Sequence, residues 1–258
     1  MPLNFKLSSR KWLLFALLSW FSASSAYSCY CGAVGQLSLE EYNNLDVLFI
    51  GTISDVVDTS GHWMAVFQVD TAIKGDTNKQ ILVYSGRSGA ACGLYFKPGQ
   101  KWIIYANIYT QGIIEASYCS RSMLIKSDSA EQSLTKEAIK YSQLPDGLIQ
   151  TSDSNAVSKK VARHKFLCKS KGRIQNNKPH GIWEYKLYEP DGLVVTYYAQ
   201  YDEGKKVGTW KYFDNTDRIC LQINYRNNIL HGNWTEYNED GTILYTETYV
   251  DGVEVNQD

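Results

Sequence analysis

The C-terminal half of the chain repeats itself, and this periodicity restricts the fold more than any other feature of the sequence. A glycine precedes a tryptophan by two positions in three similar motifs, His180-Gly-Ile-Trp183, Val207-Gly-Thr-Trp210 and His231-Gly-Asn-Trp234. A repeated tyrosine follows at intervals of 24 residues, as Tyr201, Tyr225 and Tyr249. Such a period is typical of stacked supersecondary units, each too small to bury its own hydrophobic face.

Each repeat predicts a β-hairpin. One strand carries the tryptophan and a second aromatic residue, a turn such as Pro190-Asp-Gly192 or Asp240-Gly241 follows, and a second strand ends at the repeated tyrosine. We expect the tryptophans to stack into one continuous core. Over roughly residues 174–253 the pattern resembles the variant MORN repeats of bacterial proteins, a resemblance that implies a fold but no activity. We assign residues 166–258 to this repeat domain.

The N-terminus predicts export. Lys6, Arg10 and Lys11 precede an apolar run at residues 12–21, and small residues follow at 22–26. The run is too short to cross about 30 Å of hydrocarbon, which favours a signal peptide over residues 1–28 rather than a retained membrane anchor. No later stretch is long and apolar enough to span a membrane. We therefore expect a secreted protein, extracellular or periplasmic, in an oxidising space where cysteines pair.

Two cleavage sites fit the small-residue rule of signal peptidase. Cleavage after Ala26 gives a mature chain that begins at Tyr27, and cleavage after Ser28 gives one that begins at Cys29. A lipoprotein cut before Cys29 is a third alternative, disfavoured because Ala26 stands where leucine is usual.

The region after the signal peptide predicts a small barrel. Ser38-Leu-Glu-Glu41 has the form of a capping box and begins a short helix. A second helix is expected over residues 130–143, opened by Ser129 with Gln132 three residues later. Strands separated by turn residues are expected at residues 47–57, 63–73, 80–85, 102–109 and 113–118. The expected fold class is mainly β: a five-stranded barrel with one or two packed helices, then an array of antiparallel hairpins.

Six cysteines permit fifteen complete pairings. A bridge between Cys29 and Cys31 would close a strained ring, thioredoxin-type chemistry uses C-x-x-C, and zinc binding lacks a second closely spaced ligand pair. The better interpretation is that Cys29 and Cys31 anchor two long-range disulfides. Cys168 lies before the first full repeat and Cys220 in a middle strand, so we expect a Cys168–Cys220 bridge that staples the start of the array.

Five motifs in one order carry a second resemblance. They are CYC at residues 29–31, DVLFIG at 46–51, FQVDTAIKG at 67–75, AACG at 90–93 and YCSRS at 118–122. Over about residues 29–125 the chain resembles the netrin-like module, and within it the N-terminal domain of tissue inhibitors of metalloproteinases. The resemblance implies an OB-type barrel, here assigned to residues 29–144, with bridges Cys29–Cys92 and Cys31–Cys119. A polar linker is expected at 145–165.

The resemblance also implies a function. In that inhibitor family the first cysteine is the mature N-terminus, and its amine and carbonyl oxygen chelate the catalytic zinc of the target protease; Cys29 would do so here, in trans. Tyr30 would then enter the specificity pocket of the protease, beside Cys31. Two departures weaken the match: Gly32 and Ala33 replace the usual apolar residue and proline, and the module lacks a cysteine for a third disulfide.

Composition and motifs disfavour several classes of function. The net charge is −1, with 26 Lys and Arg against 27 Asp and Glu, which disfavours a nucleic-acid partner. The nucleotide, zinc-protease and serine-hydrolase motifs do not occur, so we expect neither an enzyme nor a cofactor. His180 and His231 fit turns better than a metal site. The expectation is a secreted, non-catalytic binding protein: an inhibitor of metalloendopeptidases through the C-x-C ridge or, alternatively, an envelope-associated or extracellular scaffold or adhesion protein whose repeats bind a protein.

Overall fold

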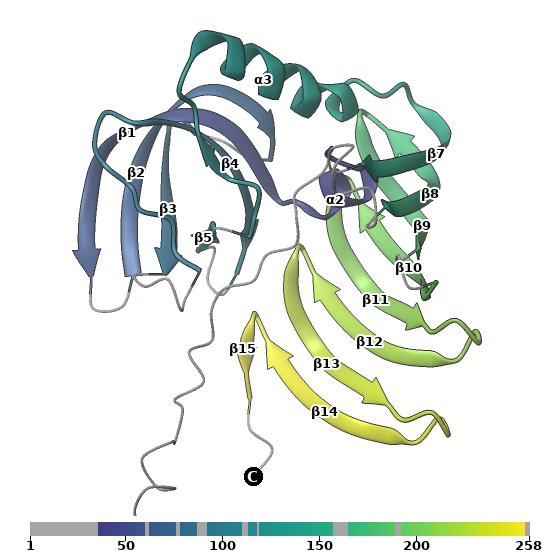
Figure 1. Ribbon diagram of the computed structural model, residues 1–258. Helices are drawn as coiled ribbons and strands as arrows, with labels where there is room; N and C mark the ends of the chain where they lie inside the picture. Colours follow the sequence, from purple (N-terminus) through teal and green to yellow (C-terminus); the bar gives the residue numbers. More distant parts are fainter. Residues whose placement is uncertain are drawn as a thin grey trace, which may run out of the picture.

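The computed structural model describes residues 36–59, 62–75, 78–86, 92–109, 113–117, 119–156, 165–188 and 192–255. Two β structures fill this part of the chain, a closed barrel and a nine-stranded antiparallel sheet, with two helices between and above them (Figure 1). This arrangement confirms the predicted fold class. Neither described helix has the length and apolar character needed to span a membrane.

Five strands close the barrel. Its strands, with a sixth that pairs to β4, are β1 (Val47–Thr59), β2 (His62–Lys74), β3 (Gln80–Gly86), β4 (Lys101–Ile108), β5 (Ile114–Glu115) and β6 (Met123–Leu124). The order β1-β2-β3-β5-β4 returns to β1 through a β1–β4 ladder, and β3 and β5 run parallel. This order is compatible with an OB-type barrel.

Strands β1 and β4 contribute to two cores, which explains their nearly continuous apolar sequences. Val47 and Phe49 of β1 belong to the barrel interior with Ile104 of β4. The alternate residues Leu48 and Ile50 face outward and are also fully buried. Since successive side chains of a strand point to opposite faces, a strand covered on both faces loses the usual alternation of apolar and polar residues.

Two helices cover the outer face of β1 and β4. Helix α2 (Leu39–Asn44) begins at the predicted capping box, with Ser38 as N-cap and Glu41 bonding back to it. Helix α3 (Asp128–Ser142) begins slightly earlier than predicted, because Ser127 rather than Ser129 is the N-cap. In Figure 1, α3 runs along the top of the molecule from the barrel to the nine-stranded sheet.

The nine-stranded sheet is a meander in chain order. Its strands are β7 (Gly147–Ala156), β8 (Lys165–Gln175), β9 (Lys178–Tyr188), β10 (Val194–Asp202), β11 (Lys205–Phe213), β12 (Ile219–Arg226), β13 (Ile229–Tyr237), β14 (Ile243–Val250) and β15 (Val253–Glu254). Tight turns with positive φ at both central residues, such as Asn176-Asn177 and Asn227-Asn228, join the strands. The predicted hairpin array is confirmed.

Aromatic rings form a ladder along the inner face of this sheet. Trp183 stacks on Tyr185 with a centroid distance of 5.8 Å, and Tyr185 stacks on Tyr197 at 4.8 Å. Tyr197 continues the ladder onto Tyr212 at 4.7 Å. The core of the repeats is therefore built from tyrosines as much as from the tryptophans that the sequence pattern emphasised.

The linker predicted at residues 145–165 is wrong for residues 147–156. Residues 147–156 form β7, which pairs with β8 from Gly147 to Ala156. This strand escaped prediction because it lies at the edge of the sheet, where one side of the strand has no neighbour and polar side chains are tolerated. Residues 157–164 lie outside the described part.

The barrel and the repeat sheet share one hydrophobic core. A single buried cluster contains Leu39 of α2, Ile50 of β1, Tyr141 of α3 and the ring ladder of the repeats. The two parts are thus packed against each other through α2 and α3.

Candidate functional site

The predicted partner-binding residues Cys29, Tyr30 and Cys31 lie outside the described residues, so their roles stay predictions. The described chain begins at Gln36, five positions after Cys31. The site can therefore be built from the described segment nearest to the C-x-C motif, residues 36–39, and from the side chains that hold it.

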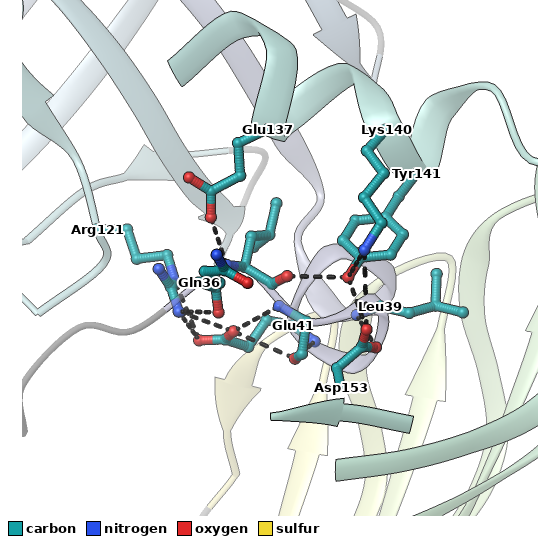
Figure 2. Close-up of polar contacts among 10 residues, drawn as sticks. Gln36, Leu39, Glu41, Arg121, Glu137, Lys140, Tyr141 and Asp153 are labelled. Atoms are coloured by element: carbon teal, nitrogen blue, oxygen red, sulfur yellow. Dashed lines mark hydrogen bonds and ion pairs between the residues drawn. The ribbon is translucent and has the colours of Figure 1, made fainter. Parts of the chain in front are cut away.

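Four side chains from distant parts of the chain bind the backbone of residues 36–39; we call this arrangement the clamp (Figure 2). They are Arg121, Glu137, Tyr141 and Asp153. Arg121 lies between β5 and β6, Glu137 and Tyr141 lie on α3, and Asp153 lies on β7. The clamp thus joins the barrel, α3 and the first strand of the repeat sheet around one short peptide.

The clamp forms hydrogen bonds with main-chain groups of Gln36, Leu37 and Leu39. Arg121 Nη2 donates to the Gln36 carbonyl at 3.1 Å, and the Leu37 N–H donates to Glu137 Oε1 at 2.5 Å. The Tyr141 hydroxyl lies 2.9 Å from the Leu37 carbonyl oxygen, and the Leu39 N–H donates to Asp153 Oδ2 at 3.1 Å. Bonds to charged groups are stronger than neutral ones, so this backbone is held firmly.

Arg121 also fixes the capping box of α2. Its Nε and Nη2 both bond to Glu41 Oε1, at 3.0 and 2.9 Å, and Nη2 lies 2.9 Å from Glu41 Oε2. Only 12% of the Arg121 side chain is exposed. A guanidinium fork of this kind fixes direction as well as distance.

The far side of α2 is bound to the ring ladder. Asn43 Nδ2 donates to the Tyr185 hydroxyl at 2.9 Å, and Asn44 Nδ2 donates to the Tyr197 hydroxyl at 2.9 Å. The Tyr201 hydroxyl donates to Asn44 Oδ1 at 2.7 Å. Burial raises the pKa of all three tyrosines, so they stay protonated at neutral pH. Helix α2 is therefore fixed on both sides.

Titratable groups meet at this helix. The Glu40 carboxylate accepts bonds from Tyr197 and Asn44, and its enclosure by neighbouring groups raises its pKa to about 7, although part of the residue reaches solvent. Lys74 Nζ donates to the carbonyl oxygens of Tyr42 and Asn43, and burial lowers its pKa to about 7.

A buried ion pair joins the barrel to the repeats near the end of α2. Lys206 Nζ of β11 lies 3.2 Å from Asp46 Oδ1, and the two side chains are 10% and 1% exposed. The other Asp46 oxygen accepts a bond from the Ile108 N–H at 2.8 Å. Both carboxylate oxygens of Asp46 are thus used.

A cavity of about 260 Å³ opens beside the clamp. Its wall includes Glu40 and Asn44 of α2, Tyr105 and Asn107 of β4, and the segment that carries Cys119 and Arg121. Cys119, the predicted partner of Cys31, therefore lies at the same end of the barrel as the clamp.

Neither Cys92 nor Cys119 is a free thiol. Their predicted partners, Cys29 and Cys31, lie outside the described residues, so the pairings Cys29–Cys92 and Cys31–Cys119 stay predictions.

The predicted Cys168–Cys220 bridge does not form, since both residues are free thiols. Cys168 lies on β8 and Cys220 on β12, with β9, β10 and β11 between them. Four strand spacings amount to about 19 Å, whereas disulfide-bonded Cα atoms lie within about 7 Å. Burial raises the pKa of the Cys168 thiol to about 12, which makes it unreactive.

The two repeated histidines occupy equivalent places next to turns. His180 Nδ1 lies 3.5 Å from Asp202, and His231 Nδ1 lies 3.5 Å from Asp251. Within the described ranges, no three His, Cys, Asp or Glu residues gather in a way that could hold a metal ion.

Sequence reasoning missed the residues that form the clamp. Arg121 falls inside the quoted YCSRS motif, but Glu137 and Asp153 lie in segments that appear only polar. Their partners are 100 and 114 positions away in the chain, a separation that no local pattern reveals. Comparison with protein-family models gave no match, and comparison with curated proteins gave none either.

Proposed function

We propose that the protein is an exported, non-catalytic inhibitor of a metalloendopeptidase, which it binds through Cys29, Tyr30 and Cys31. The observation that supports this proposal is the clamp: the backbone that begins at Gln36, five positions after Cys31, is bound by side chains from three separate parts of the fold. An anchor this close to the motif shortens the segment that must be ordered on binding, so less entropy is lost than with a free peptide.

The chemistry requires the free amine of Cys29. A catalytic zinc keeps one coordination position for water or substrate, and an amine with the adjacent carbonyl oxygen can displace that water as a five-membered chelate. The amine must be neutral to donate its electron pair, and zinc binding favours that form. We call residues 29–31 the C-x-C strip. Disulfides from Cys29 to Cys92 and from Cys31 to Cys119 would fix the orientation of its amine and carbonyl oxygen toward the zinc.

The repeat sheet has a structural part in this proposal. Asp153 of β7 and the tyrosines of β9 and β10 bind α2, which begins eight positions after Cys31. In this proposal the repeats therefore stabilise the helix that follows the C-x-C strip, besides binding any partner of their own.

The test compares three forms of the purified protein against a zinc endopeptidase of the H-E-x-x-H class. One begins at Cys29, the second at Ser28, and the third begins at Cys29 with its amine carbamylated. The proposal expects the first form to inhibit at submicromolar concentration and the other two to lose at least 100-fold in affinity, with unchanged melting temperatures. Full protease turnover at micromolar concentrations of the first form, across several such enzymes, would rule out zinc chelation by this route.

A second candidate function is a scaffold whose repeats bind a protein partner. The last full hairpin favours it, since Ile243, Leu244 and Tyr245 of β14 are 62%, 61% and 49% exposed. Exposed apolar residues on a strand near a sheet edge are typical of an interaction surface. A variant with Ile243→Glu and Tyr245→Glu should lose envelope retention in cell fractionation yet keep inhibition; equal retention of variant and parent would contradict the scaffold role.

A further inference from the structure

The outer face of the repeat sheet, opposite the ring ladder, carries a concentration of positive charge on β8 to β11. Along β8, buried Cys168, Ser170 and Ile174 alternate with exposed cationic residues. Lys211 of β11 is also exposed and Lys186 of β9 is partly exposed; we call Lys169, Lys171, Arg173, Lys186 and Lys211 the cationic face. Because strand residues alternate between faces, these side chains point away from the core.

The strand register places the cations next to one another. Lys169 of β8 lies directly opposite Lys186 of β9. A second row runs from Lys171 through Glu184 and Tyr198 to Lys211. Like charges directly opposite across a ladder are unfavourable, so folding alone gives no reason for this arrangement.

The cationic face is poorly neutralised by the protein itself. Glu184 is the carboxylate within it, and that group pairs with Lys186 at 3.1 Å. Among the described residues, Lys171, Arg173 and Lys211 form no ion pair with an acidic side chain. The protein as a whole has a net charge of −1, so this face differs in sign from the rest of the molecule. Such a local field attracts an anionic ligand.

An exposed tyrosine ring and an exposed aliphatic side chain lie between the charges. Tyr198 is 41% exposed and packs edge-on against Phe213 at 5.8 Å, and Ile182 is 69% exposed. Lys169 Nζ lies 5.1 Å from the ring centroid of Tyr188. These apolar groups are separated by charged ones, so they form no continuous surface for insertion into lipid. Single exposed rings suit stacking against a ring of the ligand.

The spacing suits a chain of separated charges. Neighbouring strands lie about 4.8 Å apart and alternate residues of one strand about 6.8 Å apart. In a nucleic-acid duplex each strand carries a phosphate about every 3.4 Å of helix axis, so a bound duplex would bring dense negative charge against Glu184. A charged glycan carries a charge only once every sugar or two, and its hydroxyl groups can donate hydrogen bonds to a carboxylate.

From these observations we propose that the cationic face binds an anionic polysaccharide. Its carboxylate or sulfate groups pair with the lysines and Arg173, and a sugar ring stacks on Tyr198. The site is separate from the C-x-C strip and does not depend on protease inhibition.

The test measures binding of the full secreted protein to heparin and to polygalacturonate, with salt concentration varied. The triple variant Lys169→Gln, Lys171→Gln, Lys211→Gln removes three cations from the face. The matched control removes three exposed cations elsewhere, Lys79→Gln, Lys126→Gln and Lys136→Gln, with the same change in net charge. We expect the first variant to bind at least ten-fold more weakly and its salt slope to fall by about 2 to 3, and the control to change less than two-fold.

Tyr198→Ala separates stacking from charge. It should weaken binding several-fold and leave the salt slope unchanged. Equal losses in the triple variant and its control, or no binding to either glycan, would overturn the proposal. Tighter binding to duplex DNA or to anionic phosphatidylglycerol vesicles than to both glycans would overturn it as well.

Discussion

The hydroxyl of Tyr201 donates a hydrogen bond to the Asn44 side-chain oxygen at 2.7 Å, although the two residues are 157 positions apart. This contact joins the C-terminal end of α2 to strand β10 of the repeat sheet. The N-terminal end of the same helix is bound by Arg121 and Asp153. This six-residue helix is therefore one place at which the barrel and the repeats meet, and it begins eight positions after Cys31.

The Asp46–Lys206 pair is expected to behave as a unit. Lys206→Met leaves a carboxylate buried without its cation and should lower the free energy of unfolding by about 3 to 5 kcal/mol. Asp46→Asn should cost a similar amount. The double variant should recover much of this loss, which urea denaturation of all four proteins in a double-mutant cycle would measure. Simple additivity of the two losses would show that the side chains do not interact.

Stability should depend on pH through Glu40 and Lys74. The pKa of Glu40 is raised from 4.5 to about 7, so between these values the folded protein binds a proton that the unfolded chain releases. The free energy of unfolding therefore falls as pH rises from 4.5 to 7, by on the order of 3 kcal/mol. The pKa of Lys74 is lowered from 10.5 to about 7, so its contribution to stability increases as pH rises from 7 to 10.5.

Two variants separate these contributions. Glu40→Gln keeps the acceptor for Tyr197 and should be more stable than the parent at pH 7 but not at pH 4. Lys74→Met should remove the increase between pH 7 and 10.5. Urea titrations across pH would measure both, and identical pH profiles for parent and variants would refute the assignment.

Arg121 should matter more for binding than for folding. Arg121→Gln removes the fork to Glu41 and the bond to the Gln36 carbonyl, which frees the backbone behind the strip. Given the proposed function, inhibition should weaken about ten-fold or more, since the strip must then be ordered on binding. Lys126→Gln, an exposed change nearby, serves as control. Inhibition that is equal in both variants would show that the clamp does not organise the strip.

Gly172 is expected to tolerate no side chain. A Cβ at this position would lie 2.1 Å from the Trp183 ring, and the backbone there has no positive φ, so the effect is one of space alone. Gly172→Ala should therefore lower stability by about 1 to 3 kcal/mol or more through overpacking. Gly99→Ala, where φ is +79° and no atom lies within 4 Å, tests backbone strain without a clash. Thermal denaturation should rank Gly172→Ala as the more damaging change.

Local sequence patterns predicted many of the helices and strands, but they did not predict how these elements pack together. The capping box at Ser38 and the hairpins around Trp183 follow from short motifs, and the structure confirms both. Strand β7 was missed because its polar sequence reads as a linker. The Cys168–Cys220 bridge was wrong because counting repeats takes no account of the width of the strands between them.

The candidate site could be predicted only in part. The C-x-C motif marks a place in the sequence, but the clamp depends on contacts between segments 85 to 114 positions apart. The cationic face was equally hidden, since its charges alternate with buried residues on separate strands and form no run in the sequence. Both features appear only when the strand register is known.

Peptide mapping of the purified, unreduced protein tests the central claim most directly, namely the prediction that the segment around Cys29 and Cys31 is fixed covalently to the barrel. The account predicts peptides that link Cys29 to Cys92 and Cys31 to Cys119, with Cys168 and Cys220 recovered as free thiols. Free thiols at Cys29 and Cys31, or bridges from them to Cys168 or Cys220, would contradict it.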